Sequence, residues 1–207
     1  AHALDSVGLS ERDVQVVNTS DADMVAAYQT SDVTAVVTWN PLVSSILEDA
    51  SAKKVFDSAQ IPGEIIDLMV ANTDVLKDNP DFGKALAGIW YDTMVVMTAD
   101  TEEGKAARTA MGTASGTDLA GFEAQMAATK LFDKPADAVA FTASPDLSKT
   151  MDLVRTFLFE KGLLGSGAAS ADVIGFELAD GSVRGDRENV QVRCTTPDMD
   201  AAAEGAL

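Results

Sequence analysis

The 207-residue sequence has one cysteine, one histidine and few basic side chains. Cys194 has no second cysteine with which to form an internal disulfide, so cysteine usage leaves the compartment open. The only histidine, His2, lies at the terminus, which argues against a Cys/His nucleophile pair. Acidic residues outnumber basic ones by 33 to 15, and the net charge is −18. Because no Lys/Arg cluster interrupts this acidity, nucleic acid and anionic membranes are poor partners.

Long hydrophobic runs are also missing. Runs such as Ile65–Ala71 are far shorter than the roughly 20 residues that a membrane span needs. The chain starts at Ala1 without a charged-then-apolar export signal, which leaves open that a signal has been removed. The glycine-rich stretches 112–116 and 162–167 lack the preceding strand and the following Lys-Ser/Thr of a phosphate-binding loop. No acidic spacing matches a calcium loop. We therefore expect no cofactor and no metal.

The first 60 residues alternate between strand and helix signals. Val14–Asn18 and Val33–Thr38 are short, β-branched and mostly apolar, as strands covered on both faces are. After the first, Ser20 with Asp23 three residues on forms a capping-box pattern that predicts a helix. After the second, Asn40 can cap a helix whose first position is Pro41. This order predicts parallel βαβ units and an α/β fold.

The second half is mainly helical. Phe82, Leu86, Ile89, Trp90, Thr93 and Met97 recur at helical spacing and predict one buried face of a long helix. Shorter helices are expected over 102–111 and 119–129. Ser144, Pro145 and the later Gly162 mark both ends of another helix. The tail segments Val173–Leu178 and Asn189–Arg193, with the turn signal Asp180-Gly181 between them, predict a hairpin or two edge strands.

Several segments resemble a known protein family. The stretches Val16–Asp23 and Asp32–Pro41 are similar to the second lobe of nitrate/sulfonate/taurine-type substrate-binding proteins. In that family a strand, an x-A-D helix and a D-A-V-V-x-W-x-P junction recur in this order. Segments Gln60–Leu68, Lys130–Phe132 and Phe141-Thr142 are similar to the binding proteins encoded beside urea carboxylase. The resemblance covers nearly the whole chain, and 32–41 is its most specific part.

The resemblance implies a periplasmic-binding-protein-like (type II) two-lobe fold, here incomplete, because the first lobe would begin upstream of Ala1. Segment Ala1–Leu9 then reads as the end of a helix that Gly8 closes. Residues 1–62 would be the βαβ portion of the second lobe. Residues 63–207 would return through a hinge to the first lobe, as a mainly helical part with C-terminal strands.

The implied function is capture of a small solute in an interlobe cleft, for delivery to an ABC permease in the membrane. The resemblance places the protein in the periplasm as a monomer and not as an enzyme. In such folds the ligand lies beyond the carboxyl ends of parallel strands, facing helix N-termini. On this sequence the expected ligand-binding residues are Thr19, Ser20, Asp21, Trp39, Asn40, Glu64 and Asp67.

Each of these residues has a structural alternative. Trp39 could belong to the core, although the following helix offers it no apolar partner at Ser44. Asn40, Ser20 and Asp21 could serve only as helix caps and dipole partners. The carboxylate of Asp67, inside an apolar run, could face solvent or a basic side chain instead of a ligand. Glu64 lies beside a bend, where charge is common.

The acidity of the first 80 residues bears on the ligand. Thirteen acidic side chains stand there against four basic ones, and no basic residue lies at a predicted strand-to-helix junction. Nitrate or a sulfonate would need fixed positive charge. A planar N–H donor such as urea, guanidinium or a related amide or amidine would suit carboxylates and Asn40, with a tryptophan face for a cation. Donor ligands are therefore favoured over the anions, which remain the alternative.

Two further classes share this fold. A thiamin-precursor-synthesis-like enzyme would need a histidine in the cleft, and His2 lies at the terminus. A regulator's ligand-sensing domain would carry a DNA-binding helix-turn-helix ahead of the lobes. The acidic balance and the helical second half favour transport, but likeness of fold alone does not choose between them.

Overall fold

The computed structural model describes residues 1–207, and the chain forms two compact units. The first unit comprises residues 1–60 and 108–129, and the second comprises residues 61–107 and 130–207. Helices hold 51% of the residues, and the only sheet is small, mixed and three-stranded. The two lobes expected from the sequence, 1–62 and 63–207, stay a prediction.

The first unit is built from short helices. Its α2 and α3 pack against each other, and α7 packs beside the second half of α6 (Glu102–Ala114), where Arg108 Nε bonds Glu123 Oε1 at 2.9 Å. The expected closure at Gly8 is confirmed, since its φ is 75°. The elements of this unit besides α6 are α1 (His2–Asp5), η1 (Glu11–Asp13), α2 (Asp21–Tyr28), α3 (Leu42–Leu47), η2 (Ser58–Gln60) and α7 (Leu119–Ala128).

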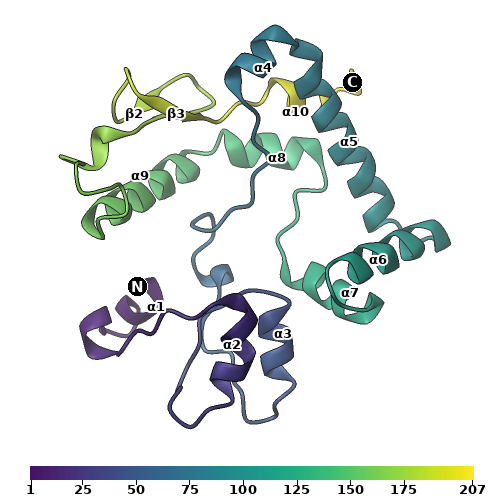
Figure 1. The fold of residues 1–207 in the computed structure, drawn as a ribbon. Helices are drawn as coiled ribbons and strands as arrows, with labels where there is room; N and C mark the ends of the chain where they lie inside the picture. Colours follow the sequence, from purple (N-terminus) through teal and green to yellow (C-terminus); the bar gives the residue numbers. More distant parts are fainter. The chain divides into compact units, whose positions relative to one another are not determined.

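The second unit holds the longer helices and the sheet. Helix α10 packs against both α5 and α8, and α4 packs against α5, as Figure 1 shows. Helix α9 packs against η3, which leads into the sheet. Its helical elements are α4 (Thr73–Asp78), α5 (Pro80–Thr98), the start of α6, α8 (Pro135–Thr142), α9 (Pro145–Glu160), η3 (Ala171–Val173) and α10 (Pro197–Ala203).

The sheet has the strand order β2-β1-β3. Strand β1 (Gly175–Glu177) pairs antiparallel with β2 (Val183–Arg184) and parallel with β3 (Val190–Arg193). The expected turn at Asp180-Gly181 is confirmed: it joins β1 to β2, and Gly181 adopts a φ of 77°. Of the two alternatives expected for the tail, Asn189–Arg193 forms an edge strand, β3, and the hairpin partner of β1 is β2.

Helix termini in the second half follow the sequence signals. Ser144 caps α9 by accepting a hydrogen bond from the Asp146 amide at 3.1 Å, and Pro145 occupies the first helical position. Gly162 follows the end of α9 with a φ of 70°. Proline also opens α5, α8 and α10. These signals succeed because a proline has no N–H to leave unpaired in the first turn.

The expected βαβ units are not formed in this structure. The segments Val14–Asn18, Val33–Thr38 and Ile65–Ala71 belong to no strand, and none of them joins the sheet. Apolar side chains along them stay exposed, with Val37 at 92%. The expectation of parallel strands was therefore wrong for this structure. The physical reason is that a strand needs a hydrogen-bonded neighbour, and β-propensity does not supply one.

The predicted buried face of α5 was also partly wrong. The helix begins at Pro80 as expected, but Ile89 is 67% exposed and Trp90 is 44% exposed. The buried side chains on α5 include Ala87, Met94 and Met97. The buried face is therefore rotated toward small and flexible side chains. Helices α10 and α4 approach α5 at Gly83, where Asp198 and Leu76 lie close to the glycine.

Few side chains leave water completely. Eight apolar residues are buried, of which only Ile46 lies in the first unit. The chain exposes 14,094 Å², whereas a compact protein of its mass exposes about 9,200 Å². Much apolar surface therefore remains in contact with water. No helix combines the length and the hydropathy that crossing a lipid bilayer requires.

A charge network ties α9 to the sheet. Arg155 donates to Asp172 Oδ1 at 2.6 Å and to Asp152 Oδ1 at 2.9 Å, and also to the carbonyl of Ala171 at 3.2 Å. Partial burial by itself lowers the pKa of Arg155, but its hydrogen bonds to these carboxylates outweigh the effect of burial and raise the pKa. Asp152 also lies 3.7 Å from Arg184 of β2. One guanidinium thus positions η3 against α9.

We predict that Arg155→Leu lowers the free energy of unfolding by about 1–2 kcal/mol, because the charge-assisted bonds are lost while both carboxylates stay partly solvated. Urea denaturation measures this change. Lys149→Leu is the matched control, since the Lys149–Asp146 pair is largely exposed and should contribute less than about 0.5 kcal/mol. Equal effects of the two substitutions would contradict the network's role.

We predict that Gly175→Ala lowers the unfolding free energy by about 1–3 kcal/mol, because the close approach of backbones at this position leaves no room for a side chain. A Cβ there would overlap the carbonyl oxygen of Asp186 and crowd Val190. Gly167→Ala, with open space around it, serves as the control and should be near neutral. An unchanged urea midpoint for Gly175→Ala would show that β1 and β3 do not approach so closely.

Candidate functional site

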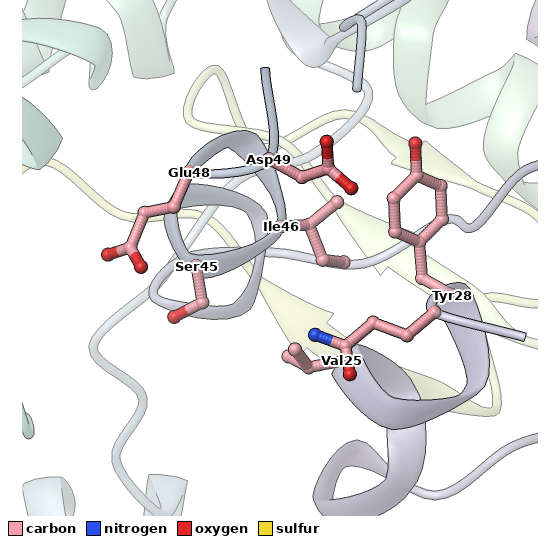
Figure 2. Close-up of a pocket in the computed structure, with 7 residues that line it drawn as sticks. Val25, Tyr28, Ser45, Ile46, Glu48 and Asp49 are labelled. Carbon is pink, nitrogen blue, oxygen red and sulfur yellow. The ribbon is translucent and has the colours of Figure 1, made fainter. Parts of the chain in front are cut away.

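The candidate site lies between α2 and α3 in the first unit. A cavity of about 290 Å³ opens there, and its lining comes from the last turns of both helices (Figure 2). The lining residues are Val25, Tyr28, Gln29, Ser45, Ile46, Glu48 and Asp49.

The two helices meet through apolar side chains. Ile46 of α3 is the buried member, while Val25 and Tyr28 of α2 are half-buried. These positions follow helical spacing, because Val25 and Tyr28 are three residues apart and therefore share one face. The same contact that joins the helices thus forms the apolar floor of the cavity.

Polar side chains surround this floor, and none of them is basic. The polar lining residues are Tyr28, Gln29, Ser45, Glu48 and Asp49, of which Asp49 turns its carboxylate toward Tyr28 (Figure 2). The side chains of Tyr28, Gln29 and Glu48 make no hydrogen bond within the protein. The lining is therefore rich in acceptors and carries negative charge.

Asp49 is the best-ordered of these groups. Its Oδ1 accepts hydrogen bonds from the Ser51 backbone N–H at 2.8 Å and from the Ser51 hydroxyl at 2.7 Å. These two donors lower the pKa of the Asp49 carboxyl. The carboxylate is therefore ionised at neutral pH, and Oδ2 is left without a partner in the protein.

The helix ends reinforce this charge. The last carbonyls of a helix lack internal partners and carry partial negative charge. Tyr28 is the last residue of α2, and Leu47, next to the cavity residue Ile46, is the last of α3. A cation or a strong N–H donor is favoured at this place, and an anion is disfavoured.

The residues expected around α2 lie at its other end. Ser20 precedes the helix, but its hydroxyl bonds Asp23 Oδ2 at 2.6 Å and does not cap a backbone N–H. Asp21 is exposed in the first turn, and Thr19 is half-buried. Val25 is the first cavity residue of α2, and at 1.5 Å per residue Asp21 lies about 6 Å before it along the helix.

The residues expected before α3 lie outside the cavity as well. Trp39 is 60% exposed, so the structure does not place it in a core. Asn40 does not cap α3 as expected, because Pro41 takes the N-cap position. The Asn40 side chain instead accepts from the Ser44 hydroxyl at 2.9 Å. The role of both residues in ligand binding stays a prediction.

The two remaining expected residues belong to the second unit. Asp67 is exposed in a segment without regular structure. Glu64 is half-buried in a turn, where its backbone N–H bonds the carbonyl of Ile61 at 3.1 Å. Neither residue lines the cavity, and their role in binding stays a prediction.

The cavity carboxylates were missed by sequence reasoning. Glu48 and Asp49 follow α3 directly, and acids at the end of a helix are unfavourable there without a compensating role. Acidic residues at a helix C-terminus were therefore the sequence feature that could have pointed to this site. Tyr28 was also not among the residues expected to bind a ligand.

Other chemistry finds little support elsewhere in the chain. No three His, Cys, Asp or Glu side chains gather closely enough to hold a metal ion. Burial raises the pKa of the half-buried Cys194 thiol, which lowers the fraction of reactive thiolate. Binding at the α2–α3 cavity is the chemistry that the residues support best.

Comparison with protein-family models, curated proteins and solved structures finds no match to this chain. The resemblance to nitrate/sulfonate/taurine-type binding proteins therefore stays a hypothesis.

We predict that Ile46→Ala lowers the unfolding free energy of the first unit by about 2–4 kcal/mol, because it opens a void where α2 and α3 meet. The neighbouring Leu47, 42% exposed, gives the matched control, and Leu47→Ala should cost less. Hydrogen exchange of the α2 and α3 amides, with urea denaturation, measures both. Similar losses for the two variants would argue against Ile46 as the centre of this contact.

Proposed function

We propose that this chain is the extracytoplasmic solute-binding component of an ABC importer and captures a small nitrogen compound. Urea, guanidinium and related amides or amidines are the ligand class. The cavity between α2 and α3 carries the proposal, because its polar lining consists of acceptors and amphoteric groups without one basic side chain. The proposed role is binding and delivery, not catalysis.

The charge of the site separates this ligand class from the anions. Nitrate and sulfonates are bound by fixed positive charge or by converging N–H donors. The cavity presents the Asp49 carboxylate and two helix C-termini instead. Compounds with several N–H donors match this lining, since carboxylates only accept when ionised.

The proposal includes a type II two-lobe fold, a membrane permease as partner and a periplasmic location. What supports these finer points is the resemblance of residues 16–23 and 32–41.

The experiment is calorimetric titration with guanidinium, urea, nitrate and taurine. The variants are Tyr28→Ala in the cavity, Trp39→Ala at the site expected from the sequence, and Val37→Ala as a control at a 92% exposed position. We expect a nitrogen compound to bind the native chain, at least tenfold weaker binding by Tyr28→Ala, and no change for Val37→Ala.

The variants also locate the ligand. Loss of binding in Trp39→Ala but not in Tyr28→Ala would move the site to the start of α3 and contradict the cavity as its place. Binding of nitrate or taurine alone would overturn the choice of ligand class. Circular dichroism of each variant checks that its helices are retained.

A further inference from the structure

The α2–α3 cavity sets a carboxylate opposite an aromatic ring. Figure 2 shows the Asp49 carboxylate and Ile46 directed toward the Tyr28 side chain, whereas Glu48 and Ser45 lie on the other side of α3. A planar N–H donor between Asp49 and Tyr28 would meet a negative carboxylate oxygen on one side and the phenol group, a second acceptor, on the other. A charged donor gains more from this pairing than a neutral one, because hydrogen bonds between ionised groups are the stronger ones.

The carboxylate is held in place before any ligand arrives. Ser51 fixes Oδ1 through two hydrogen bonds, and this contact lowers the pKa of Asp49. Oδ2 remains available. Because the group is already ordered and charged, a ligand does not have to supply the free energy of positioning it.

The cavity is larger than a bare guanidinium ion. Its volume of about 290 Å³ equals the volume that roughly ten water molecules occupy in the liquid. Guanidinium has only four non-hydrogen atoms and would fill less than half of this space. Val25 and Ile46 add apolar surface to the lining. A short alkyl substituent on the cation would fill this space and cover those side chains.

We propose that the cavity selects alkyl-substituted guanidinium or amidinium cations, with the planar head between Asp49 and Tyr28 and the alkyl group against Val25 and Ile46. This inference rests on the proposed function and narrows its ligand class. Selection has two independent parts. Charge discriminates the cation from a neutral urea of the same shape, and apolar contact discriminates it from unsubstituted guanidinium.

The test is calorimetric titration of the chain with n-propylguanidinium, n-propylurea and guanidinium at low ionic strength. Propylurea has nearly the shape of propylguanidinium but no charge, so the pair isolates the electrostatic part. We expect propylguanidinium to bind at least tenfold more tightly than either of the others. Asp49→Asn should remove most of the preference over propylurea while leaving propylurea binding nearly unchanged.

Asp32→Asn is the matched control, because it removes one negative charge from an exposed residue of the same unit outside the cavity. It should leave the preference within twofold of the native value. Loss of preference in both variants would assign it to net charge and overturn the role of Asp49. Equal affinities for propylguanidinium and propylurea in the native chain would overturn the inference while leaving a nitrogen-compound binder in place. Failure of all nitrogen compounds to bind would overturn the proposed function itself.

Discussion

The number of apolar side chains that can leave water limits every other feature of this structure. Ile46 is the only hydrophobic side chain buried in the first unit, and no large side chain is completely buried anywhere. With so little core, local interactions hold most of the fold. Hydrogen bonds within helices, the Ser144 cap of α9 and the Arg155 network do so in the second unit. The same limit leaves the valine-rich segments exposed, because a sheet would need both a neighbouring strand and a covering layer.

The candidate site shares its residues with this sparse packing. Ile46 joins α2 to α3 and also forms the cavity floor, so stability and binding depend on one contact. Around it the protein places carboxylates at helix ends, an arrangement that costs stability. A bound cation would relieve that repulsion. The negative charge that destabilises these helix ends is thus the same charge that favours the proposed cation.

The sequence and the structure place the site at different ends of the same helices. The rule that ligands lie beyond the carboxyl ends of parallel strands led to Ser20, Asp21, Trp39 and Asn40. Those positions favour anions through the helix N-termini, whereas the acidic composition favoured a donor. The cavity lies at the C-terminal ends, where the preference for a donor and the local field agree. The ligand class expected from the sequence therefore agrees with the charge of the cavity, whereas the residues expected to bind that ligand do not line the cavity.

The sequence by itself determined the helices and their ends in the second half of the chain. Proline at the first position, the Ser144 cap and glycines with positive φ act within a few residues, so their effect needs no distant partner. Only the tertiary structure decided which face of α5 is buried, whether the valine-rich segments pair, and that Tyr28 and Asp49 line one cavity. Each of these depends on which segments approach one another, and hydrophobic periodicity along one segment carries no information about its neighbour.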